Sequence, residues 1–296
     1  MSAHGHNPSA TPSTKRRLTA ALALAAAYLM AEVIGGLWSG SLALLADAGH
    51  MLTDVGGLGL ALLALRFSER PATSDRTYGY YRGEILAALA NAVVLVLISL
   101  YVLYEAYQRF QAPPEVASGT VLIVASVGLV VNVAGILLLR SGAQDSLNVK
   151  GAYFEVLSDL LSSIAVIAAA GVMWLTGWYY ADPIVSAGIG LFILPRTWRL
   201  IGEAVGILLE GTPSDVNMTA LRSGLGRVPG VRDVHDLHVW TLTSGYNAMS
   251  AHLLMEDESL LRSIIDGARA VAGEHNIRHV TVQVEPEGCE RNEFHL

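Results

Sequence analysis

The stretch "LLADAGHMLTDVGGLGLAL", residues 44–62, is apolar enough to cross a lipid bilayer, yet it carries three ionisable side chains. They are Asp47, His50 and Asp54. An ionisable group in hydrocarbon is costly and is kept where it meets a cavity, a polar partner or an ion. The stretch therefore predicts a membrane span that carries a functional site.

The composition of the whole chain also indicates a membrane protein. The 296 residues are 52% hydrophobic and 15% charged, and the mean hydropathy is +0.45. A soluble protein has about 25% charged residues. The net charge of −7, with no tract of Lys and Arg, argues against nucleic-acid binding. The lone cysteine, Cys289, excludes an intramolecular disulfide.

Six segments have the roughly 20 apolar residues that a membrane span needs. They are residues 18–38, 42–65, 84–106, 117–139, 149–173 and 182–203. Eleven Lys and Arg residues flank these spans on one side and only Arg109 on the other, so both termini are expected in the cytoplasm. We expect a six-helix membrane domain over residues 17–210, after a disordered tail at residues 1–16. Pro195 should kink the sixth helix or end it early.

The composition changes after about residue 211, where a small cytosolic domain is expected over residues 211–290, followed by a tail at 291–296. A helix opens it, with Thr212 or Ser214 as the candidate cap. The segments 231–242, 248–256 and 278–285 alternate like strands, and residues 258–275 form an amphipathic pattern. The order helix–strand–strand–helix–strand predicts an α+β domain with helices on one face of its sheet. The fold class is therefore an α-helical membrane bundle with a small α+β domain.

Two spans carry paired ligand-type side chains. His50 and Asp54 are four residues apart, and so are Glu155 and Asp159 in "GAYFEVLSDLLSS". This spacing stacks each pair on one helix face. Two facing helices then supply one imidazole and three carboxylates, which suits a divalent transition metal. A polar packing contact between helices is the alternative for any one of these residues alone.

Other polar residues in the spans are less specific. Asp47, three residues before His50, would orient the imidazole or face a water-filled cavity. Glu32, Asn91 and Asn132 would line the cavity, and interhelical hydrogen bonding is the alternative for the two asparagines.

The chain resembles the cation diffusion facilitators from about residue 17 to residue 290, and the bacterial cobalt–zinc–cadmium resistance branch in particular. The resemblance is carried by "SLALLADAGHMLTD", "TYGYYRGEILAAL", "GAYFEVLSDLLSS", "WYYADPIVSAGIGLFI", "ILLEGTP", "VHDLHVWTLTSG" and "HVTVQVE". It implies a dimeric antiporter in a bacterial inner membrane that exports divalent metal in exchange for protons, with a metallochaperone-like cytosolic domain. Metal would be the substrate and a regulatory ligand, with no cofactor.

The resemblance also assigns roles to residues. The transport site falls on His50, Asp54, Glu155 and Asp159, and Glu155 stands where many relatives have His. The loop between spans two and three has no histidine, so no metal site is expected there. Arg82 and Glu210 match a salt bridge at the dimer hinge.

In the cytosolic domain the family's metal positions match His235, His252 and Glu285. Gln283 stands where some relatives use His, and His279 is a further candidate on the same strand. His238, at an odd spacing from His235, is expected on the opposite strand face as packed structure. The alternative for the whole set is ordinary surface histidines.

A membrane metalloenzyme and a metal sensor are the alternatives to a transporter. A membrane metalloenzyme would use a bound metal to activate water, but the sequence has no HExxH motif. A metal sensor would use the membrane helices only as an anchor, which the four ligand-type residues inside the bundle argue against. Zinc is the expected substrate, with cadmium and cobalt as further ones.

Overall fold

A computed structural model of the chain describes residues 12–68, 73–139 and 147–286. Within these ranges several side chains lie outside the description, among them those of Asp54 and Glu155. The expected tails at residues 1–11 and 291–296, and Cys289, lie outside the described residues. The chain divides into two compact units, one of residues up to 59 with 90–199, the other of residues 60–89 with those from 200 onward.

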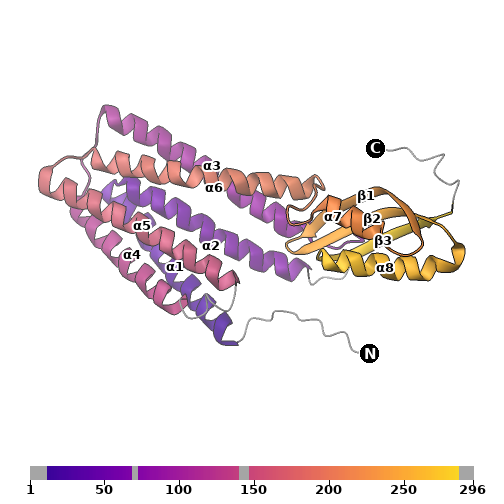
Figure 1. Ribbon diagram of the computed structural model, residues 1–296. Helices are drawn as coiled ribbons and strands as arrows, with labels where there is room; N and C mark the ends of the chain where they lie inside the picture. Colours follow the sequence, from indigo (N-terminus) through magenta and orange to yellow (C-terminus); the bar gives the residue numbers. More distant parts are fainter. Residues whose placement is uncertain (1–11, 69–72, 140–146, 287–296) are drawn as a thin grey trace. The chain divides into compact units, whose positions relative to one another are not determined.

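Six long helices carry the membrane part of the chain (Figure 1). They are α1 (Pro12–Ser39), α2 (Leu42–Ser68), α3 (Arg82–Gln111), α4 (Ser118–Leu139), α5 (Leu147–Thr176) and α6 (Ala181–Leu208). Among the described residues, five of them contain a stretch long and apolar enough to cross a membrane, and α2 contributes the shorter apolar stretch Leu42–Thr53. The expected α-helical membrane bundle is confirmed.

Two helix boundaries differ from expectation. Helix α1 begins at Pro12, so residues 12–16, expected in the disordered tail, are helical. Helix α6 continues through Pro195 for 13 further residues to Leu208, so the expectation of an early end is wrong. Interior proline is tolerated in membrane helices where hydroxyl side chains satisfy backbone groups. Pro195 leaves the Leu191 carbonyl without its helical donor. The nearby Thr197 hydroxyl donates to a different carbonyl, that of Ile193, at 3.1 Å.

The start of α2 is fixed by a side chain from α6. The Asp182 carboxylate accepts hydrogen bonds from the Ser41 hydroxyl at 2.6 Å and from the Leu42 and Ala43 amides at 2.8 and 3.2 Å. A carboxylate satisfies the orphan amides of a helix N-terminus and complements its dipole. Arg109 of α3 lies 3.5 Å from Asp182 and donates to the Gly40 carbonyl at 2.6 Å. We call this group the Asp182 anchor; it joins α2, α3 and α6.

The C-terminal part folds in the order α7 (Met218–Leu225), β1 (Val231–Thr243), β2 (Tyr246–Met255), η1 (Glu258–Leu260), α8 (Leu261–Glu274) and β3 (Ile277–Glu285). The sheet order is β1-β2-β3, with β1 and β2 antiparallel and β2 and β3 parallel. Figure 1 shows α7 and α8 beside the sheet. The expected helix–strand–strand–helix–strand domain is confirmed.

The core of this domain lies between the sheet and its helices. Leu221 and Leu225 of α7, Ile264 of α8, and Met249 and Leu253 of β2 are fully buried. Burying each such side chain contributes about 1.5–3 kcal/mol. This packing fixes the three strands side by side and so sets the register of the candidate site.

The N-cap of α7 lies later in the chain than the sequence pattern predicts. The helix begins at Met218, and Asn217 is its N-cap, with its side-chain oxygen accepting from the Ala220 amide at 3.0 Å. Thr212 and Ser214 precede the helix by several residues. The prediction of Thr212 or Ser214 is therefore wrong; asparagine is a preferred cap, as serine and threonine are, and the sequence pattern did not single it out.

Candidate metal centres

The first candidate centre lies between α2 and α5. His50 and Asp159 are 7% and 6% exposed, and His50 Nε2 lies 3.8 Å from Asp159 Oδ1. The two residues are 109 positions apart in the chain. Their proximity was expected because each belongs to a pair of ligand-type residues four apart on its own helix. The structure therefore brings together one residue from each motif.

The other two residues of the quartet are placed by their helices. Asp54 lies one turn after His50 in α2, and Glu155 lies one turn before Asp159 in α5. The two helices run in opposite directions (Figure 1), so Asp54 and Glu155 lie towards the same end of the centre. Their side chains lie outside the described part of the chain.

Polar residues around this centre are buried. Asp47 is 1% exposed and Glu32 of α1 is 0% exposed. Asn132 of α4 donates to the Ser163 hydroxyl of α5 at 3.1 Å, and Asn91 of α3 donates to the Thr53 carbonyl of α2 at 2.8 Å. The two asparagines thus make the interhelical hydrogen bonds that were the alternative to lining a cavity.

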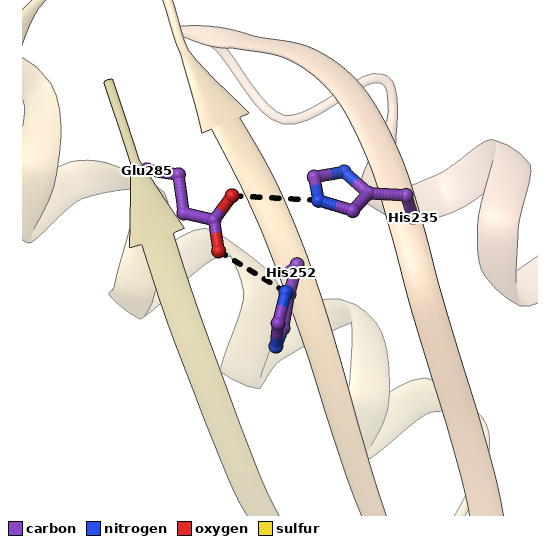
Figure 2. A group of neighbouring side chains, drawn as sticks. All are labelled: His235, His252 and Glu285. Carbon is purple, nitrogen blue, oxygen red and sulfur yellow. Dashed lines mark ion pairs between the residues drawn. The ribbon is translucent and has the colours of Figure 1, made fainter. Parts of the chain in front are cut away.

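The second candidate centre is formed by three neighbouring strands (Figure 2). His235 of β1 is directly opposite His252 of β2, and Glu285 of β3 is paired with Leu254, two residues further along β2. His252 Nδ1 lies 3.1 Å from Glu285 Oε1, and His235 Nε2 lies 3.4 Å from Glu285 Oε2. One ligand atom from each residue falls within 4.8 Å of the others.

This geometry suits a transition metal. Two imidazoles and one carboxylate form a common protein ligand set for zinc, which leaves a position open for water or another ligand. Glu285 is only 4% exposed, and a buried carboxylate needs a compensating charge or hydrogen bonds. Gln283 is oriented towards the same group, because its amide donates to Glu285 Oε1 at 2.6 Å. His279 is not brought to it; its ring packs edge-on against Tyr78 at 5.7 Å.

Sequence reasoning missed Asp236 beside this centre. Its Oδ1 lies 2.8 Å from His238 Nε2, and its Oδ2 lies 3.6 Å from His252 Nε2. The hydrogen bond from His238 holds the pKa of the Asp236 carboxyl below its usual value. The residue has a φ of 46°, and the strand register shifts between His235 and His238. A pure alternation of side chains cannot anticipate such a bulge.

The same irregularity corrects the expectation for His238. Its side chain is 51% exposed, so it is not packed structure. The bulge removes the strict alternation on which that expectation rested.

The first turn of α3 carries two further contacts. Arg82 Nη2 donates to Glu210 Oε1 at 2.7 Å, which brings together the two residues that the family resemblance paired. Glu84 accepts from the hydroxyls of Thr243 and Ser244, at the turn between β1 and β2, and the Ser244 distance is 3.1 Å. Nothing in the sequence pattern indicated the Glu84 contact, because its partners lie about 160 residues away.

Comparison with known proteins covers nearly the whole chain. Residues 18–209 match the cation efflux transmembrane domain, and residues 213–287 match the cation efflux protein cytoplasmic domain. The metal cation efflux system protein CzcD of Cupriavidus metallidurans is 43% identical over 289 residues, covering 97% of this chain and 92% of that protein.

Two further relatives have a similar sequence identity to this chain. The cadmium, cobalt and zinc/H(+)-K(+) antiporter of Bacillus velezensis is 40% identical over 95% of this chain and 91% of its own. The zinc transporter ZitB of Escherichia coli is 40% identical over 99% of this chain and 95% of its own. A solved structure, the metal-bound C-terminal domain of the CzcD transporter, aligns with 24% of this chain at 30% identity and a TM-score of 0.22.

The family matches agree with the helical membrane part and the appended α+β domain. The chain therefore belongs to the cation efflux family, the cation diffusion facilitators, and is a membrane transporter rather than an enzyme.

Proposed function

We propose that the protein exports divalent transition-metal ions, zinc foremost and cadmium and cobalt as well, from the cytoplasm in exchange for protons. The observation that carries the proposal is the buried approach of His50 to Asp159, with an acid four residues away on each helix. Four ionisable groups inside a membrane bundle require a cation or one another. One relative is named a metal cation efflux system protein, and another a cadmium, cobalt and zinc/H(+)-K(+) antiporter.

The exchange with protons follows from the ligands. A metal binds ionised carboxylates and a neutral imidazole, so protons and metal compete for the site. His50 is the natural member of the quartet to take part, because an ordinary imidazole titrates near neutral pH. Opening to the far side would let a proton displace the metal and reset the carrier. The excess of Lys and Arg on one side of the spans supports an orientation with both termini in the cytoplasm.

Flux into proteoliposomes tests this proposal. A zinc-sensitive dye and a pH-sensitive dye are followed together, with zinc, cadmium, cobalt, manganese and iron supplied in turn. The wild type should move zinc and protons in opposite directions, and Asp54→Ala combined with Asp159→Ala should abolish both fluxes. Asp75→Ala with Asp215→Ala, two exposed acids, is the matched control. Metal flux without proton flux, or full flux in the first double variant, would overturn the proposal.

We further propose that His235, His252 and Glu285 hold a regulatory metal ion in a homodimer. The support is the cluster's geometry and the match of residues 213–287 to the family's cytoplasmic domain. His252→Ala in the full-length protein should reduce bound zinc by one ion per chain, as counted by equilibrium dialysis, while the membrane site remains loaded. His275→Ala, at the end of α8, serves as the control. An unchanged zinc count in His252→Ala would refute this assignment.

A further inference from the structure

Two buried acids outside the proposed metal ligands face each other across α1 and α2. Glu32 is 0% exposed and Asp47 is 1% exposed. Within the described part of the chain, no hydrogen bond of ordinary geometry reaches either Glu32 oxygen or Asp47 Oδ1. No ion pair joins either residue to a basic side chain among the described residues. A buried polar atom without a partner requires an explanation.

The neighbours of this pair come from four helices. The Glu32 carboxyl faces the Asp47 carboxyl and the Tyr28 hydroxyl, and Asp47 also faces Ser162 of α5. Tyr28 is itself 3% exposed, and its hydroxyl would lie 1.9 Å from a Cβ at position 128, so only glycine fits there in α4. The pair is therefore enclosed rather than open to solvent.

Two charged or titratable groups of the metal centre act on the pair from a distance. The charge of His50, on α2, reaches Asp47, and the charge of Asp159, on α5, reaches Glu32. Neither Glu32 nor Asp47 belongs to the quartet. The pair itself supplies only two carboxyls, fewer than the three or more ligands that a bound transition metal requires. In the described residues only the His235 cluster gathers three such ligands.

Chemistry limits what this pair can bind. An ionised carboxylate only accepts hydrogen bonds. Two facing carboxylates therefore cannot hydrogen-bond to each other, and their negative charges repel. One hydrogen between them converts the pair into a donor and an acceptor and removes one buried charge. We propose that Glu32 and Asp47 share one proton and form a proton-binding site of the transport cycle, separate from the metal ligands.

This inference rests on the proposed metal–proton exchange. It identifies Glu32 and Asp47 as the residues that bind one of the exchanged protons. When a divalent ion enters the quartet, its positive charge favours ionised carboxylates nearby. The shared O–H bond then breaks, its electron pair stays on the carboxylate oxygen, and the proton leaves. When the metal departs, a proton returns to the pair. Metal binding thereby releases a proton from residues that do not touch the metal.

Proton release on zinc binding is the test. Purified full-length protein is titrated with zinc in two buffers that differ in ionisation enthalpy, which counts the protons released per metal bound. Glu32→Gln and Asp47→Asn should each release one proton fewer per zinc bound than the wild type. In proteoliposomes, both variants should show a lower proton-to-zinc ratio. Glu115→Gln, an exposed acid between α3 and α4, should match the wild type.

The outcomes separate this inference from the proposed function. A wild type that carries zinc without protons defeats the exchange itself. A coupled wild type whose proton release persists in both Glu32→Gln and Asp47→Asn defeats the shared-proton site alone. If either substitution fails to fold, the exchange variant Glu32→Asp with Asp47→Glu keeps both carboxyls. It should retain the wild-type proton count, and loss of that proton would contradict the proposal.

Discussion

At the scale of single residues, the approach of His50 to Asp159 is what identifies both as candidate metal ligands. Alone in a span, either side chain is an ordinary polar contact, but both are buried and 3.8 Å apart. In the proposed quartet, the family resemblance puts Glu155 where many relatives have His, which would complete a second HxxxD motif. Carboxylates suit harder cations such as manganese, and imidazole suits zinc. The identity of this one residue should therefore affect the choice of metal.

We expect Glu155→His to increase the preference for zinc over manganese by about tenfold, equivalent to about 1.4 kcal/mol. The physical reason is the replacement of a hard oxygen ligand by a nitrogen ligand. Competition between the two metals in the proteoliposome assay measures the ratio. Glu203→His, an exposed position on α6, should leave it unchanged. An unaltered ratio in Glu155→His would show that this position does not select the metal.

The residue scale also shows what the sequence could and could not predict. A spacing of four stacks His50 with Asp54, and Glu155 with Asp159, on one helix face each, because helix geometry is regular. The matching pairs on two spans then predicted that His50 and Asp159 lie close together. Asp236 was missed because it lies at a bulge with a φ of 46°, where alternation fails. Glu84 and its partners were missed because the contact depends on tertiary packing, which no local pattern encodes.

At the scale of elements, the helix ends depend on neighbours more than on their own residues. The N-terminus of α2 has no acidic residue in its first turn and takes its cap from Asp182 of α6. Helix α6 persists past Pro195, although local propensity argues for a break. Close contact between helices likewise depends on small residues, as at Gly128 of α4.

We expect Asp182→Ala to lower the free energy of unfolding by about 3–5 kcal/mol, because it leaves the Arg109 charge and the α2 amides without their partner. Thermal unfolding of the detergent-solubilised protein, followed by tryptophan fluorescence, measures the change. Asp182→Asn keeps an acceptor oxygen and should cost less. Asp215→Ala, an exposed acid, should have little effect. Equal stability of Asp182→Ala and wild type would mean that the Asp182 anchor does not hold the helices together.

The contact at Gly128 gives a second prediction at this scale. A methyl group there would meet the Tyr28 hydroxyl at 1.9 Å and its ring carbon at 2.1 Å, so we expect Gly128→Ala to destabilise the bundle by about 1–3 kcal/mol. Gly171→Ala in α5 meets nothing within 4 Å, and alanine there should stabilise the helix by up to about 1 kcal/mol. Opposite signs in the same thermal assay support the packing. A neutral Gly128→Ala would contradict it.

At the scale of the whole molecule, the start of α3 is the segment that links helix to cytosolic domain. Within one compact unit it carries Arg82, paired with Glu210 just after α6, and Glu84, bonded to the turn after β1. Tyr81 also stacks on Tyr246 at the start of β2, with ring centroids 5.8 Å apart. A metal bound at His235 on β1 would therefore act on a strand whose far end contacts this segment.

The Arg82–Glu210 pair should matter more for transport than for stability. Arg82 is 36% exposed and Glu210 62% exposed, so the pair contributes at most about 1 kcal/mol to folding. We expect Arg82→Glu to change the unfolding temperature little while reducing zinc flux several-fold, because two acids then repel each other between the start of α3 and the segment just after α6. Combining it with Glu210→Arg restores opposite charges and should recover most of the flux. A loss of flux that the double variant does not recover would mean that Arg82 acts through another partner, and an unchanged flux in Arg82→Glu would remove the pair from the transport cycle.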